Sequence, residues 1–175
     1  MQTIKAAVCH EHGAPLVVEN IQIAAPKLGE VEVSLDAVAI CHSDISYAEG
    51  GWGGHLPAVY GHEAAGVITA LGEGAGGFEL GDAVVVTLIR ACGSCQNCAS
   101  GKPTICNTPT PGVNGPISTV DGGPLDQAMA CGAFAEKVVV DHSQIVKIPE
   151  TMSKEAACLL SCGVITGVGA AVNAG

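Results

Sequence analysis

Positive charge is scarce in this chain of 175 residues, which has 7 Lys and Arg against 17 Asp and Glu and a formal net charge of −10. Nucleic acids and anionic membrane surfaces both attract clustered cations, so the sequence argues against either partner. The chain also lacks a run of about 18 uncharged apolar residues, the length that a helix needs to cross a bilayer. We therefore expect no membrane span.

Aromatic residues are equally rare, at 3%, whereas the chain has 24 Gly and 9 Pro. This composition is typical of turn-rich β structure with a core of Val, Ile, Ala and Leu. The first eleven residues contain Lys5, His10 and Glu11 and no sustained apolar run, so they do not resemble a signal peptide. We expect a cytoplasmic protein, long enough for one domain with a sizeable core.

Short β-type segments dominate the first 150 residues, and helix signals appear only after them. Apolar alternation or short apolar runs predict strands at 5–9, 16–23, 31–37, 64–71, 83–89, 133–140 and 145–148. Ser153 is a candidate N-cap for a helix that includes 156–160, and 164–174 also favours a helix. Strands first and helices later predict a mainly β fold, a barrel or sandwich with a few helices at its end.

Two glycine-rich segments are interpreted as connections. Residues 108–126, rich in Pro, Gly, Thr and Ser, predict a long surface loop. Gly72–Gly77 matches the G-x-G-x-x-G fingerprint of dinucleotide-binding folds, but that fingerprint requires a helix that begins at the glycines. Here another β-branched strand follows, so we predict a turn that links two strands.

The nine cysteines are an odd number in a chain without an export signal, which favours metal binding over disulfides. Cys92, Cys95, Cys98 and Cys106 have the spacing of a closed tetrahedral zinc site with Zn–S bonds of about 2.3 Å. An iron–sulfur cluster of the ferredoxin type would place its fourth cysteine where this chain has Lys102. We predict a structural zinc lobe at about residues 90–110.

A second metal site could use Cys41, His62 and Cys162. Three protein ligands with one open position are the arrangement of a catalytic zinc. The spacing alone does not decide the point, because Cys41 and Cys162 could be buried packing residues and His62 an ordinary loop histidine.

Several motifs, in order along essentially the whole chain, resemble the zinc-containing alcohol dehydrogenases of the medium-chain dehydrogenase/reductase superfamily. They are Cys41-His42-Ser43-Asp44, Gly61-His62-Glu63-Ala64-Ala65-Gly66, Gly81-Asp82-Ala83-Val84, the four-cysteine segment and Cys162-Gly163-Val164-Ile165-Thr166-Gly167. The resemblance implies a GroES-like β-barrel and two zinc ions per chain. In this family Cys41, His62 and Cys162 would bind the catalytic zinc, and Cys92, Cys95, Cys98 and Cys106 the structural one.

The resemblance also implies roles for five further residues. Ser43 would hydrogen-bond the alcohol and pass on its proton, Asp44 would orient His62, and Glu63 would adjust the zinc coordination. At the cofactor, His42 would lie near the pyrophosphate and Thr166 against the nicotinamide. Ser43 and Asp44 could instead only cap a helix, and Glu63 could be a solvated carboxylate.

The proton relay departs from the family pattern. Many relatives have a histidine at the position of Ser46. We expect the relay beyond Ser43 to pass through Ser46 or through water.

The implied reaction is oxidation of a primary or secondary alcohol to an aldehyde or ketone, with hydride transfer to NAD or NADP. Family members act as dimers or tetramers and carry a Rossmann domain after this region, whereas the present sequence has no βαβ pattern and ends at Gly175. We therefore expect residues 1–175 to be the N-terminal part of the catalytic domain, inactive without the cofactor domain. The alternative is a non-catalytic GroES-like zinc-binding module that acts through protein contacts.

Overall fold

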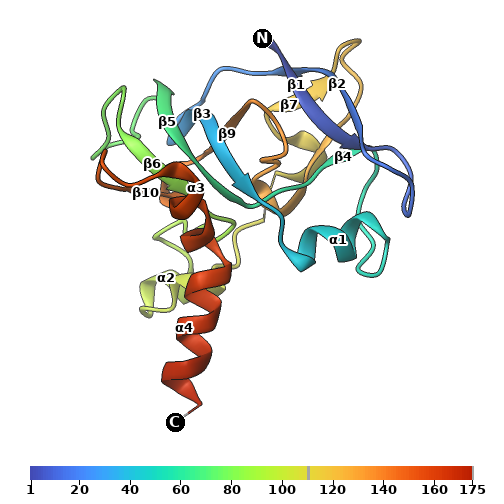
Figure 1. The fold of residues 1–175 in the computed structure, drawn as a ribbon. Helices are drawn as coiled ribbons and strands as arrows, with labels where there is room; N and C mark the ends of the chain where they lie inside the picture. Colours follow the sequence, from blue (N-terminus) through green and yellow to red (C-terminus); the bar gives the residue numbers. More distant parts are fainter. Residues whose placement is uncertain (110, 175) are drawn as a thin grey trace.

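The computed structural model describes residues 1–109 and 111–174, and its strands form two five-stranded sheets (Figure 1). In the first sheet the order is β7 (Ile117–Thr119), β2 (Val17–Ile23), β1 (Gln2–Cys9), β4 (Ala58–Val59) and β8 (Asp126–Gln127). In the second sheet the order is β10 (Ile145–Lys147), β6 (Ala83–Val86), β5 (Glu63–Leu71), β3 (Glu30–Ala39) and β9 (Lys137–Asp141). All neighbouring strands are antiparallel except β4 and β8.

The core between the sheets consists mostly of Val, Ile and Ala, as the scarcity of aromatic residues predicted. Strand β9 shows how the two sheets share this core. Val138 and Val140 pack with the apolar residues of the second sheet, whereas Val139 packs with Ile4 and Ile23 of the first. Because successive side chains on a strand point to opposite faces, one strand contributes to both halves of the core. The predicted mainly β, near-barrel fold is confirmed.

The predicted strands are confirmed, with corrections at their ends. The hairpin of β1 and β2 pairs Gln2 with Ile23 and Val8 with Val17. The strand expected at 133–140 begins only at Lys137, because Ala133 and Phe134 donate their backbone N–H groups to Gly61 and Tyr60 instead.

The connection expected at 108–126 was wrong in part. Residues 117–119 form β7, and a 3-10 turn occupies Gly112–Asn114. Strand β7 is only three residues long, too short to stand out in the sequence, and it pairs with β2. The expected loop and the expected lobe at 90–110 both include Thr110, which, like Gly175, lies outside the described residues.

The turn predicted at Gly72–Gly77 is confirmed, since it links β5 to β6 without a helix. A Cβ atom on Gly72 would lie 1.8 Å from the carbonyl oxygen of Lys27. Close backbone packing therefore requires the glycine there, and no part of the segment has the form of a dinucleotide site.

In the described part of the chain, the sheets are accompanied by the α-helices α1 (His42–Ala48), α2 (Gln96–Ala99), α3 (Lys154–Ala157) and α4 (Gly163–Asn173). The hydroxyl of Ser153 accepts a hydrogen bond from the N–H of Ala156, which confirms the predicted N-cap. Helix α4 buries no residue and extends away from both sheets (Figure 1). Within 1–109 and 111–174, no single helix is long and apolar enough to cross a membrane. Only the pair Lys154–Ser161 and Gly163–Asn173, with a bend of 50° between them, has the necessary length and apolar composition.

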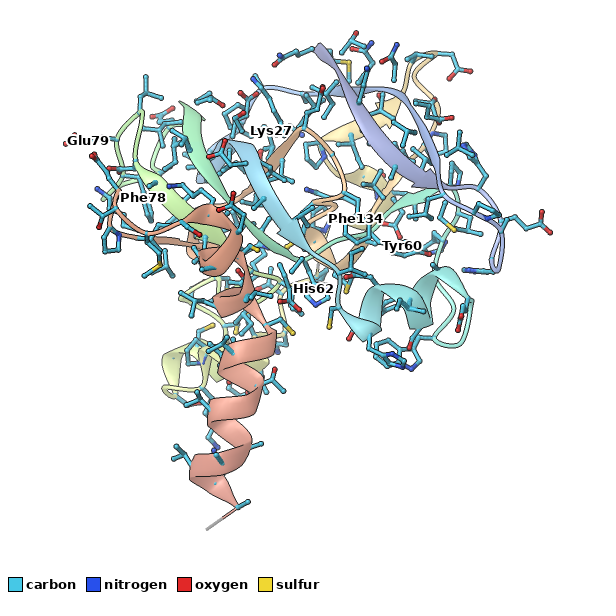
Figure 2. All side chains as sticks on the ribbon, viewed as in Figure 1. Lys27, Tyr60, His62, Phe78, Glu79 and Phe134 are labelled. Carbon is cyan, nitrogen blue, oxygen red and sulfur yellow. The ribbon has the colours of Figure 1, made fainter. Side chains whose placement is uncertain are left out.

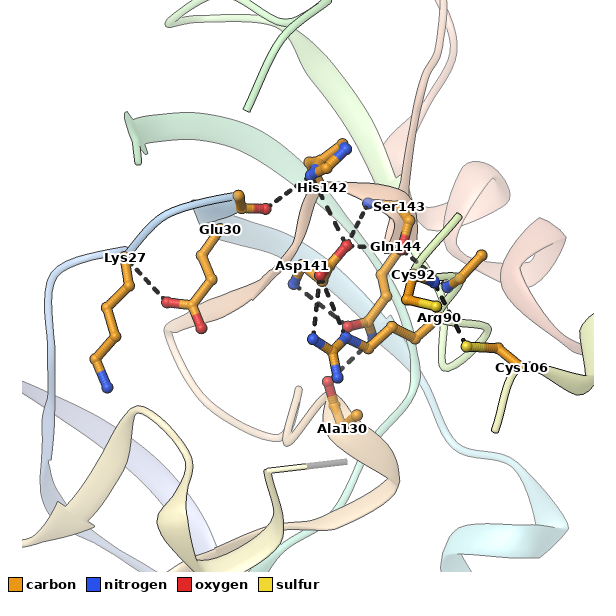
Figure 3. Close-up of polar contacts among 12 residues, drawn as sticks. Lys27, Glu30, Arg90, Cys92, Cys106, Ala130, Asp141, His142, Ser143 and Gln144 are labelled. Carbon is orange, nitrogen blue, oxygen red and sulfur yellow. Dashed lines mark hydrogen bonds and ion pairs between the residues drawn. The ribbon is translucent and has the colours of Figure 1, made fainter. Parts of the chain in front are cut away.

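The four-cysteine segment is attached to the second sheet through Arg90 (Figure 3). The Nε and Nη2 atoms of Arg90 donate to Oδ2 of Asp141 at 3.3 and 3.2 Å, and Nη1 donates to the carbonyl oxygen of Pro109 at 3.1 Å. Next to it, Ala91 N–H donates to the hydroxyl of Ser143 at 3.0 Å. Arg90 therefore holds the two ends of the lobe together and fixes both to β9.

We predict that Arg90→Met destabilises the chain by about 1–2 kcal/mol at pH 7, because it removes charge-assisted hydrogen bonds from a half-buried carboxylate. Burial raises the pKa of Asp141, but the bonds from Ser143 and Arg90 outweigh it and hold the pKa below its ordinary value of 3.8. A depressed carboxyl pKa stabilises the folded state above that ordinary value, and this stabilisation is lost as the pH falls through the folded-state pKa.

In urea denaturation, the free energy of unfolding of the wild type should therefore exceed that of Arg90→Met by the full amount at neutral pH. The difference should shrink below about pH 4. Lys147→Met is the matched control, because its ion pair with Asp82 is more exposed to water, and it should cost less than Arg90→Met. Equal costs for both variants would mean that Arg90 does not hold the lobe.

Candidate metal centres

The first centre is built around the start of α1. Cys41 is the N-cap residue, with extended backbone angles, and its N–H donates to Oδ2 of Asp44 at 2.9 Å. Asp44 thus caps the helix from its third position, as in one half of a capping box. Neither Ser43 nor Asp44 is the N-cap residue, and the support that Asp44 gives to the helix start is only part of what this carboxylate does.

The other oxygen of Asp44 reaches the start of β5. Oδ1 lies 3.0 Å from the backbone N of Gly61 and 3.0 Å from Nδ1 of His62. Asp44 and His62 are 2% and 1% exposed, so both groups are shielded from water. Because an ionised carboxylate can only accept, Nδ1 of His62 carries the hydrogen of this contact, and Nε2 is the nitrogen left to bind a metal. This is the state in which an imidazole binds a metal.

The backbone before His62 is fixed by Gly61. Its φ angle is +93°, and a Cβ atom there would lie 2.6 Å from Cδ1 of Phe134. Only glycine combines this left-handed conformation with so close an approach. Tyr60, beside it, accepts the N–H of Phe134 at 2.8 Å, so His62 enters the centre from a rigid segment.

Four side chains from three parts of the chain meet here. The ligand atoms of Cys41, His62, Glu63 and Cys162 all lie within 4.8 Å of one another. Figure 2 shows His62 below the sheets, between the start of α1 and the C-terminal helices. The structure thus brings together the three residues of the second predicted site, although 121 positions (162 − 41) separate the first from the last.

This donor set suits zinc. Two thiols and an imidazole nitrogen are its usual protein ligands. Burial raises the pKa of the Cys162 thiol, and the neighbouring Cys41 and Glu63 raise it further. These neighbours disfavour the Cys162 thiolate, and a divalent cation at this point would favour it instead. Glu63 is 3% exposed, so its expected alternative as a solvated carboxylate is wrong.

The second centre is the four-cysteine lobe. The sulfur atoms of Cys92, Cys95, Cys98 and Cys106 lie within 4.8 Å of one another. Backbone N–H groups point at these sulfurs, from Cys95 to Cys92 at 3.2 Å, from Cys98 to Cys95 at 3.4 Å and from Cys92 to Cys106 at 3.4 Å. Such bonds stabilise thiolates, and helix α2 places Cys98 one turn after Cys95.

The thiols of this lobe have opposed pKa shifts. A hydrogen bond from Thr108 and backbone N–H groups lower the pKa of Cys92 to about 5, whereas burial raises that of Cys98 to about 12. Thiolates this close repel one another, so four of them coexist only around a cation. With no oxygen or nitrogen ligand in the set, it fits a closed structural zinc site.

The remaining predicted residues lie beside the first centre. His42 is exposed and Ser43 half-buried, both in the first turn of α1. Thr166 is exposed one turn into α4, with its hydroxyl 3.9 Å from the sulfur of Cys162. Ser46 is half-buried on the same helix as Ser43.

Two residues next to this centre had no sequence signal. The hydroxyl of Thr87 donates to the carbonyl oxygen of Ser161, 74 positions away, at 3.0 Å. No motif marks either residue, since their proximity depends on how the C-terminal segment packs on β6.

Known proteins share this architecture. Residues 27–150 match the family described as Alcohol dehydrogenase GroES-like domain. The chain is 40% identical over 180 residues to the alcohol dehydrogenase class-3 of Drosophila melanogaster, and this match covers 98% of the chain and 47% of that protein. The chain therefore spans about half the length of the curated relatives it matches.

Solved structures agree. The crystal structure of an alcohol dehydrogenase zinc-binding domain protein from Burkholderia ambifaria superposes with a TM-score of 0.90 at 33% identity, covering 99% of this chain and 49% of that one. Benzyl alcohol dehydrogenase from Acinetobacter calcoaceticus gives 0.86 at 29% identity, with the same coverage. The chain thus belongs to the alcohol dehydrogenase GroES-like domain family, among the zinc-containing alcohol dehydrogenases of the medium-chain dehydrogenase/reductase superfamily.

Proposed function

We propose that residues 1–175 are the N-terminal part of the catalytic domain of a zinc-dependent alcohol dehydrogenase, with a structural lobe at about 90–110. The enzyme oxidises a primary or secondary alcohol to an aldehyde or ketone and transfers hydride to NAD or NADP. The observation that carries this proposal is the convergence of Cys41, His62 and Cys162 within 4.8 Å beside a carboxylate. A purely structural zinc site would need no such partly open set of ligands.

Each chain holds two zinc ions in this proposal, one at each centre. Cys92, Cys95, Cys98 and Cys106 hold the structural ion, and Cys41, His62 and Cys162 the catalytic one. When bound there, the catalytic zinc polarises the alcohol oxygen as a Lewis acid and lowers the pKa of the hydroxyl.

The chain's own residues prepare this chemistry. Asp44 keeps the hydrogen of His62 on Nδ1 and caps the helix that begins beside Cys41, so one carboxylate orients two ligands. Glu63 accepts the N–H of Gly163 at 3.4 Å, a long contact that leaves its second oxygen free to approach the centre when a ligand leaves. Ser43 accepts the proton of the alcohol and passes it to Ser46 or to water.

The cofactor contacts in this chain are few. His42 is exposed at the start of α1 and can approach a pyrophosphate, and Thr166 lies close enough to Cys162 to contact a nicotinamide ring. The remaining contacts belong to a Rossmann domain of the complete enzyme, which acts as a dimer or tetramer.

Metal analysis tests the two centres separately. We expect about two zinc ions per purified wild-type chain and about one in His62→Ala, because that variant loses a ligand of the catalytic centre only. Cys98→Ser should lose the other ion. Elemental analysis by mass spectrometry gives the ratio, and one ion in the wild type would favour a non-catalytic zinc-binding module.

Turnover tests the catalytic role of Cys41. In the complete enzyme, Cys41→Ser should lower kcat by at least about a hundredfold, since it weakens the metal that stabilises charge in the transition state. Steady-state assays of NAD reduction with a primary alcohol measure the change, with Cys9→Ser as control. Cys9 is buried in β1 of the first sheet, outside both centres, so its variant should keep activity. A near-normal rate for Cys41→Ser would remove Cys41 from the metal.

A further inference from the structure

The chain bends sharply where it delivers Cys162 to the first centre. The segments Lys154–Ser161 and Gly163–Asn173 meet at 50°, and Cys162 between them has the non-helical angles φ −145° and ψ −64°. At such a break the preceding carbonyl groups lose their helical partners and need others. The position of Cys162 therefore depends on what holds the carbonyl group of Ser161.

Thr87 provides that partner. Its hydroxyl donates to the carbonyl oxygen of Ser161 at 3.0 Å and accepts the N–H of Ile89 at 3.3 Å. A backbone N–H can only donate, so the Ile89 contact leaves the hydroxyl hydrogen free to point at Ser161. The two contacts together fix the direction of the Thr87 hydroxyl.

Thr87 is itself held on both sides by Gln144. Its N–H donates to the carbonyl oxygen of Gln144 at 2.9 Å, and Nε2 of Gln144 donates to the carbonyl oxygens of Thr87 and Ala130, each at 3.0 Å. Gln144 is 1% exposed. The backbone of Thr87 is therefore fixed at the end of β6 in the second sheet, and its hydroxyl group is fixed with it.

The second sheet also fixes His62, which directly precedes β5. Val86, directly before Thr87, pairs with Ala64, two residues after His62. The hydroxyl of Ser161 also lies 3.5 Å from the carbonyl oxygen of Ala64, a weaker contact that likewise joins the Cys162 segment to β5. Thr87 thus ties the Cys162 segment to the strands that carry the other ligands.

We propose that Thr87 is a positioning residue for Cys162: through the carbonyl group of Ser161, its hydroxyl sets the distance of the Cys162 sulfur from Cys41 and His62. This role rests on the proposed zinc site. Removing a group that orients a metal ligand costs about ten- to a hundredfold in metal affinity, and we expect the lower end because Thr87 acts through one backbone group.

Zinc competition tests this on the 175-residue chain. Titration of the metal-free protein against a chromophoric chelator should show two binding steps, of which His62→Ala removes the one at the first centre. Thr87→Val should weaken that step about tenfold and leave the four-cysteine step unchanged. Thr87→Ser keeps the hydroxyl and should restore wild-type affinity. Thr69→Val is the control, because it removes a hydroxyl of β5 that donates to Glu32 of β3, and it should change neither step.

A second measurement reports on Cys162 itself. In zinc-loaded Thr87→Val, iodoacetamide should alkylate Cys162 faster than in the wild type, with a smaller change at Cys41; peptide mass spectrometry locates the label. If the wild type has only one zinc step, the proposed function fails and this role fails with it. If the wild type has two steps and Thr87→Val keeps both affinities, or weakens both equally, the positioning role alone is wrong.

Discussion

The carboxylate of Asp44 is the interaction on which the first centre depends. It is buried and accepts three N–H groups, one from Cys41 directly before α1 and two from Gly61 and His62 directly before β5. A buried carboxylate is costly unless it is fully hydrogen-bonded, so these three donors must meet at one point for the chain to fold here. The hydrogen bonds that stabilise the Asp44 carboxylate thus also fix the positions of Cys41 and His62, two residues of the first centre.

A chain of polar contacts links the two centres through the second sheet. Arg90 joins the base of the lobe to Asp141, whose N–H approaches Oε1 of Gln144 at 3.3 Å. Gln144 holds Thr87, and Thr87 holds Ser161 next to Cys162. These groups lie at the ends of β6, β9 and β10, where the strands stop pairing and free backbone groups need partners. The second sheet therefore serves as the common base of both centres.

A feature of the fold could be predicted from the sequence where the pattern that marks it lies within a few neighbouring residues. Alternation and apolar runs are local, so most of the strands and the four-cysteine lobe could be predicted from spacing. Strands β4, β7 and β8 could not, because two or three residues form a strand only where a partner edge is available. Helix α1 was missed because it is short and its inward residue, Asp44, is polar. Cys41, His62 and Cys162 needed the family resemblance, and Thr87 left no trace in any motif.

The two centres differ greatly in how much chain they enclose. The sulfurs of the lobe come from positions 92 to 106, 14 residues apart (106 − 92), whereas those of the first centre are 121 apart (162 − 41). Closing a short loop costs less conformational entropy than closing a long one, and here the long one also waits for both sheets to pair. In the proposed enzyme the lobe would therefore be able to bind its zinc ion during synthesis, before Cys162 has emerged, and the first centre would bind its own ion second.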